Sequence, residues 1–165
     1  EVELFLNGKS LGVKKKTGDD LHVMWRVVYE PGTLKAVSRK DGKVVLTKEV
    51  KTAGAPAKIV LSADRKNIHA DGKDLSFVTL TVYDKDGNVV PDAANLIKFS
   101  IVGNAFIAAT DNGCQTDLTS FQSPERKAFN GLALAVVQSN GKTGTIKLTA
   151  TSAGLPAASI EINAQ

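Results

Sequence analysis

The sequence holds few cysteine and histidine residues, and each shortage argues against a class of protein or of site. Cys114 is the only cysteine among 165 residues, which excludes an internal disulfide, a disulfide-stapled scaffold and a Cys-based zinc site. There are two histidines: His22 lies on the solvent side of a predicted strand, and His69 lies just before a turn. We expect neither to act as a catalytic base. No apolar run approaches the roughly 18–20 residues of a membrane span.

Basic residues are only slightly in excess, which argues against nucleic acid as a partner. The formal net charge is +4, and the single basic run is Lys14–Lys16 in a predicted loop. Nucleic-acid binding needs a wider basic stripe with interleaved aromatic side chains. The chain opens without Met, inside an apolar–polar alternation and with no visible signal peptide. We therefore expect a processing site or an internal boundary there rather than a natural N-terminus.

What the sequence does contain is alternation with a period of two almost throughout, which predicts β-strands. The clearest case is residues 21–29, where Leu21, Val23, Trp25, Val27 and Tyr29 form one apolar face. This pattern predicts a long strand whose Trp25 and Tyr29 side chains lie in a core. Asn-Gly and Asp-Gly pairs recur between the alternating stretches and predict tight turns. No stretch shows a sustained helical period, so the predicted fold class is all-β.

The strands fall into two groups, which predicts two tandem immunoglobulin-like β-sandwich domains. Residues 52–57 are small and rich in chain breakers, which is typical of a domain junction. Residues 55–165 are long enough for a complete sandwich, whereas residues 1–54 supply about half of one. We therefore expect the first domain to be truncated at its N-terminus, without the strand that should pair with residues 1–7. Its bare edge beside Phe5 would make residues 1–12 a site for strand-edge self-association.

The sequence predicts no catalytic residue, no metal site and no cofactor. The carboxylates of Asp111, Asp117 and Glu125 lie in an irregular segment, where Asp111 begins a turn sequence. Residues 84–88 start like a calcium loop, but glycine stands at the fourth position rather than the sixth, so a hairpin turn is favoured. Phe99 is predicted to be core. Phe121 and Phe129 bracket residues 120–129 and are interpreted as anchors of that segment, with an exposed sugar-binding surface as the open alternative.

Several stretches, taken in order, resemble the region that follows the catalytic barrel in family 2 glycoside hydrolases, the β-galactosidase family. VELFLNGKSLG at 2–12 and YEPGTLKAV at 29–37 carry the resemblance in the first group of strands. AGAPAKIVLSAD at 53–64 resembles the entry into that family's C-terminal immunoglobulin-like domain. The stretches that fit the same domain are DGKDLSFV at 71–78, DKDGNVVP at 84–91, DNG at 111–113 and RKAFNGLAL at 126–134.

The resemblance implies an accessory role rather than a catalytic one. The family's catalytic glutamates lie on a barrel that this sequence does not contain, so the barrel of the same polypeptide is the expected partner, with carbohydrate as a further one. It also implies a periplasmic or extracellular location. The expected contact surface is a set of loop residues, with Arg126 closing the loop on a carboxylate: Asp111, Asn112, Gly113, Phe121, Arg126, Phe129 and Asn130. Spacer domains of a bacterial adhesin and a carbohydrate-binding module are the alternatives.

Overall fold

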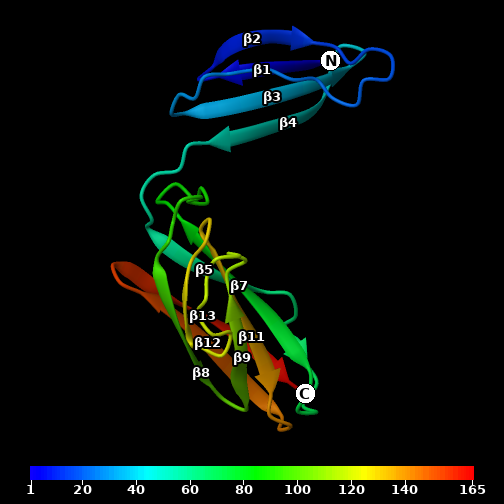
Figure 1. Ribbon diagram of the computed structural model, residues 1–165. Coiled ribbons are helices and arrows are strands. Elements are labelled where there is room, and N and C mark those ends of the chain that lie inside the picture. Colours follow the sequence, from blue (N-terminus) through cyan, green and yellow to red (C-terminus); the bar gives the residue numbers. More distant parts are fainter. The chain divides into compact units, whose positions relative to one another are not determined.

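A computed structural model describes all 165 residues and contains strands and turns but no helix (Figure 1). The all-β prediction is therefore confirmed. The chain divides into two compact units, Glu1–Thr52 and Ala53–Gln165. The boundary falls within the small, breaker-rich segment 52–57.

The first unit is one four-stranded antiparallel sheet in the order β2-β1-β3-β4. Its strands are β1 (Val2–Leu6), β2 (Lys9–Lys14), β3 (Thr33–Lys40) and β4 (Lys43–Lys51). The expectation of a missing strand beside residues 1–7 is wrong, because β1 pairs with β2 on one side and with β3 on the other. The edge strands are β2 and β4, and of residues 1–12 only the β2 part lies at an edge. The unit contains one sheet, where a sandwich has two.

The prediction of a strand at residues 21–29 is also wrong, because these residues belong to no sheet. Tyr29 is 74% exposed and Trp25 is only half-buried, so neither is a core residue. The alternation itself is present, because Val23 and Trp25 are more buried than their neighbours Met24 and Arg26. Alternation reports which side of the backbone a side chain occupies. It does not guarantee that a neighbouring strand is there to hydrogen-bond with.

The second unit is a β-sandwich of two sheets. One sheet has the order β5-β7-β11-β9 and the other β10-β8-β12-β13-β6. The strands are β5 (Lys58–Ala63), β6 (Asn67–Ile68), β7 (Leu75–Tyr83), β8 (Leu96–Val102), β9 (Ala105–Asp111), β10 (Glu125–Lys127), β11 (Leu132–Ser139), β12 (Gly144–Ser152) and β13 (Leu155–Ala164).

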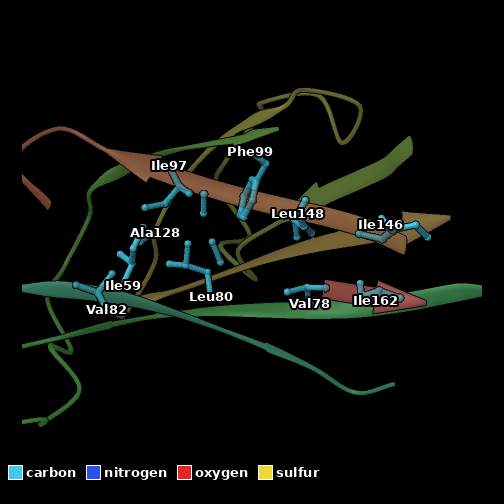
Figure 2. Close-up of a cluster of buried hydrophobic side chains, with 14 of the residues drawn as sticks. Ile59, Val78, Leu80, Val82, Ile97, Phe99, Ala128, Ile146, Leu148 and Ile162 are labelled. Carbon is cyan, nitrogen blue, oxygen red and sulfur yellow. The ribbon is translucent and has the colours of Figure 1, made fainter. Parts of the chain in front are cut away.

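Side chains of alternating residues from both sheets form the core of this sandwich. Figure 2 shows Ile97, Phe99 and Leu148 of one sheet facing Leu80 and Ile59 of the other. Phe99 is 5% exposed, which confirms its predicted core position. Burying a side chain of this size contributes roughly 1.5–3 kcal/mol, and the apolar cluster has eighteen buried members, all in the second unit. The core therefore gives the second unit a rigid frame for its loops.

Candidate functional site

The candidate contact surface is built on the segment that links β9 to β10, and Arg126 is its centre. Arg126 is the middle residue of β10 and stands opposite Ile97 of β8 in the ladder. The alternation of this strand turns Arg126 inward, so that the side chain is 1% exposed while Lys127 is exposed. A buried guanidinium must find partners for its five N–H groups, and the preceding loop provides them.

Arg126 binds the loop at both of its ends. Its Nη2 donates to the carbonyl oxygens of Thr110 at 2.8 Å and Ser120 at 2.8 Å, and its Nη1 donates to the carbonyl of Thr119 at 3.0 Å. Nη1 also pairs with Asp117 Oδ2 at 3.1 Å. The prediction that Arg126 closes the loop on a carboxylate is confirmed, and the carboxylate is Asp117.

Asp117 is held by the loop as firmly as Arg126 is. The Thr119 backbone N–H donates to its Oδ1 at 2.9 Å and Asn112 Nδ2 donates to its Oδ2 at 2.8 Å. Hydrogen bonds from Thr119 together with the ion pair to Arg126 hold the pKa of the Asp117 carboxyl well below its ordinary value. Asn112 donates in addition to the carbonyl of Lys127 at 3.0 Å, and so ties the loop to β10.

Asp111 and Gly113 form the turn that begins the loop. The Asp111 Oδ1 atom accepts the N–H groups of Asn112 and Gly113 at 2.7 and 3.2 Å, which is an Asx-type turn. Gly113 has a φ of +73°, a conformation that side chains rarely adopt. Both residues are therefore loop scaffolding, as the sequence indicated.

The tip of the loop carries two exposed apolar side chains, Leu118 and Phe121. Leu118 is 95% exposed and Phe121 is 62% exposed. The interpretation of Phe121 as a buried anchor is wrong. Its ring instead lies over the Arg126 guanidinium, whose Cζ is 5.8 Å from the ring centroid, and the Phe121 carbonyl accepts the Thr110 N–H at 2.7 Å. The backbone is thus fixed while the apolar side chains face solvent.

Phe129 and Asn130 do not join this cluster. They belong to a separate two-residue turn in which Phe129 and Leu132 exchange backbone hydrogen bonds of 2.8 and 3.0 Å. Phe129 is 40% exposed, so its side chain is only partly buried, and its interpretation as an anchor of residues 120–129 stays a prediction. Asn130 has a φ of +51°, and the next residue approaches the Val90 backbone closely enough to exclude a side chain. The structure therefore brings together Asn112, Phe121 and Arg126 and leaves Phe129 and Asn130 apart.

Sequence reasoning missed the buried carboxylate of Asp84, which is 1% exposed. It accepts hydrogen bonds from the backbone of Gly54 at 2.8 Å, of Asp86 at 2.9 Å and of Asn88 at 2.8 Å. These hydrogen bonds lower the pKa of the Asp84 carboxyl strongly, and the bond from the Gly54 N–H has the largest effect. The favoured hairpin turn at 84–88 is confirmed, and Asp84 also clamps the first residues of the second unit. Its position one residue after a strand was the only signal for this role.

The charged groups of these loops are occupied by one another and by the backbone. The Arg126 and Asp117 charges neutralise each other, and the exposed part of the loop, from Gly113 to Ser123, carries no other charge. No group of three or more His, Cys, Asp or Glu side chains is placed to hold a metal ion. The structure contains no helix that is long and apolar enough to span a bilayer. An uncharged, rigidly supported tip suits contact with a partner rather than proton transfer.

Comparison with known proteins places both units among glycoside hydrolases. Residues 59–161 match the family model described as glycoside hydrolase family 2 C-terminal domain 5, and residues 1–46 match a domain of unknown function. The chain is 55% identical over its whole length to a β-galactosidase of Bacteroides ovatus, BoGH2A, and covers 19% of that protein.

Solved structures agree with these matches. A glycosyl hydrolase family 2 member from Bacteroides cellulosilyticus is 44% identical, with a TM-score of 0.94 over 99% of this chain and 21% of that one. A β-glycosidase from Bacteroides vulgatus is 31% identical, with a TM-score of 0.89 over 98% of this chain and 21% of that one. The chain therefore spans about a fifth of the length of the relatives it matches. The adhesin and carbohydrate-binding-module alternatives are not favoured by these matches.

Proposed function

Because the chain belongs to glycoside hydrolase family 2 and carries its C-terminal domain 5, we propose that it is a non-catalytic accessory region of a β-galactosidase-like enzyme. The observation that carries this proposal is the alignment of the whole chain with a β-galactosidase, at 55% sequence identity. The catalytic barrel of the same polypeptide is the proposed partner, and β-galactosides or related β-glycosides are the proposed substrates of the whole enzyme.

The accessory role consists of presenting fixed surfaces to the rest of the enzyme. The sandwich of the second unit supplies the rigidity, and the loop braced by Arg126 presents Leu118 and Phe121 outward without a charge to desolvate. Apolar side chains on a fixed backbone lose little conformational entropy on contact, which favours association. The proposed location is periplasmic or extracellular, as the resemblance implies, and cell fractionation with an antibody against the chain tests it.

A graft tests the accessory role. The stretch of the Bacteroides ovatus β-galactosidase that aligns with this chain is replaced by residues 1–165, and a second variant lacks the stretch altogether. We expect the graft to recover the soluble yield, thermal midpoint and β-galactosidase activity that the deletion loses. The isolated chain should hydrolyse no nitrophenyl β-galactoside. A deletion that is as stable and active as the graft contradicts the proposal.

The same preparations test the finer partners. Calorimetry with β-galactosides and polysaccharides, using Phe121→Ala as a control, measures whether carbohydrate binds the loop. Sedimentation of the isolated chain measures self-association through residues 1–12, for which β2 is the available edge. Heat of binding at millimolar sugar would establish carbohydrate as a partner. A dimer that Ser10→Pro in β2 abolishes would establish self-association through residues 1–12.

A further inference from the structure

Exposed apolar side chains are concentrated in the first unit. Eleven of the twenty-one large hydrophobic residues that are exposed lie within residues 1–52, although these make up less than a third of the chain. Val37 is the one hydrophobic residue of this unit that is fully buried, whereas the second unit has a core cluster of eighteen. A sheet with an uncovered apolar face has little stability of its own, so exposed apolar side chains that share a face of it indicate an interface.

The strand register places three of these exposed residues on one face of the sheet. Leu6, Leu34 and Val50 stand opposite one another across β1, β3 and β4, and Leu46 follows on the same face of β4. Leu46 and Val50 are 61% and 63% exposed. The part of this face on β1 and β2 is contacted by the segment that follows β2. Leu6 and Leu11 line a pocket of about 330 Å³ together with Trp25 and its neighbours in residues 25–30.

Residues 21–29 have the side-chain pattern of a strand without the hydrogen bonds of one. No backbone N–H or carbonyl of this segment takes part in a backbone–backbone hydrogen bond. The only hydrogen bond to its backbone comes from Lys14 Nζ, which donates to the Met24 carbonyl at 2.7 Å. The buried indole Nε1–H of Trp25 also lacks a partner. An apolar alternation with unpaired backbone groups is what a strand leaves when its neighbour is absent.

We propose that residues 21–29 are an acceptor strand, which pairs edge to edge with an extended segment of the parent enzyme outside this chain. The added segment continues the layer that residues 21–29 begin and covers Leu34, Leu46 and Val50 with its own apolar side chains. The first unit then becomes a two-layer sandwich. This inference rests on the proposed function and deepens it by naming the surface through which the region joins its enzyme.

Charge and chain length select this occupant over a second copy. Residues 1–52 hold eleven Lys and Arg against seven Asp and Glu, so they carry the whole net charge of +4, while residues 53–165 are neutral with ten of each. Two copies joined through the first unit would repel each other, whereas a segment with flanking acidic residues would be attracted. The chain covers only about a fifth of its relatives, so such a segment can belong to the same polypeptide, where its effective concentration is high.

Hydrogen exchange of the isolated chain and of the graft described above tests the inference. In the isolated chain the amides of 21–29 should exchange close to the unstructured rate. In the folded graft we expect those that point toward the added strand to exchange at least about tenfold more slowly. Arg26→Pro and Val27→Pro are made separately, because successive N–H groups of a strand point to opposite edges. One of them should lower the thermal midpoint of the graft, while the control Lys16→Pro should not.

Each other outcome overturns the inference in a recognisable way. A folded, active graft with unprotected amides at 21–29 contradicts the acceptor strand and leaves the accessory role intact. Concentration-dependent protection of 21–29 in the isolated chain assigns the surface to a second copy instead. If the graft is no more stable or active than the deletion, the proposed accessory role fails. Hydrogen exchange is then measured on the intact Bacteroides ovatus enzyme, in the residues that align with 21–29. Fast amide exchange in those residues rejects the acceptor strand.

Discussion

Arg126 and Asp117 form an ion pair of 3.1 Å in which the guanidinium is 1% exposed and the carboxylate side chain 17% exposed. The pair lies at the base of a loop of uncharged residues, and both partners make further hydrogen bonds to the backbone of that loop. A pair of this kind fixes a shape: it determines where Leu118 and Phe121 stand at the surface of the second unit.

Replacing Arg126 should therefore destabilise the second unit strongly. Arg126→Met keeps the apolar stem but leaves the Thr110, Thr119 and Ser120 carbonyls without their donor, and we expect a loss of about 2–4 kcal/mol in the free energy of unfolding. Urea titration measures it. Lys127→Met, one residue along β10 and exposed, is the matched control and should change stability by less than about 0.5 kcal/mol. Equal effects of the two changes would contradict the central position of Arg126.

The depressed pKa values of Asp84 and Asp117 predict a loss of stability in acid. Each carboxyl has a folded-state pKa below its ordinary value near 4. The folded state therefore binds fewer protons, and the stability that these groups contribute is fully present above that ordinary value. It is lost as pH falls below it. Urea titrations between pH 7 and pH 2 should show this decline, and it should be shallower in Asp84→Asn. An identical pH profile for the variant would contradict the assignment.

The Asp84 clamp should matter more than its exposed neighbour in the same turn. Asp84→Ala removes the acceptor of the Gly54, Asp86 and Asn88 N–H groups, so we expect a lower thermal midpoint and faster exchange of the Gly54 amide. Asp86→Ala, at an exposed residue of the same turn, is the control and should leave both unchanged. A Gly54 amide that exchanges at the same rate in Asp84→Ala as in the unmodified chain would show that the clamp is not formed in solution.

The two apolar residues at the loop tip should be dispensable for folding. Leu118→Ser and Phe121→Ala remove side chains that are 95% and 62% exposed, so each should shift the free energy of unfolding of the isolated chain by less than about 1 kcal/mol. In the graft the same changes should lower stability further if the tip contacts the barrel. A large loss already in the isolated chain would mean that the tip is structural.

Alternation and turn chemistry predicted most of the second unit because its strands have partners within the chain. Residues 96–102 alternate in sequence and in burial alike, and the Asp86-Gly87 pair forms the expected turn. In residues 132–139 the burial alternates but the sequence does not, because Ala133, Ala135 and Val137 are buried and Leu132 is exposed. The Arg126 cluster was only partly predictable. Arg126 and the turn at 111–113 were named, but its pairing with Asp117 depends on a loop path that no periodicity encodes.

Two predictions failed in the first unit, each for its own physical reason. Val23 and Trp25 alternate as strand residues do, yet a strand also needs a neighbour, and the residues of this chain provide none for 21–29. The position of β1 between two strands was missed because sequence alternation does not state the order of strands in a sheet. Exposed residues such as Leu118 were missed because an isolated apolar residue in a loop carries no pattern.

We propose that this chain supports a glycosidase without taking part in its chemistry, and steady-state kinetics of the graft test that proposal most directly. The graft and the unmodified Bacteroides ovatus β-galactosidase are compared on a nitrophenyl β-galactoside after correction for the fraction of active sites. We expect kcat and KM to agree within about twofold, because the proposed accessory role places no group of this chain at the reacting atoms. A tenfold or greater change in kcat at equal active fraction, or turnover by the isolated chain, would contradict the account.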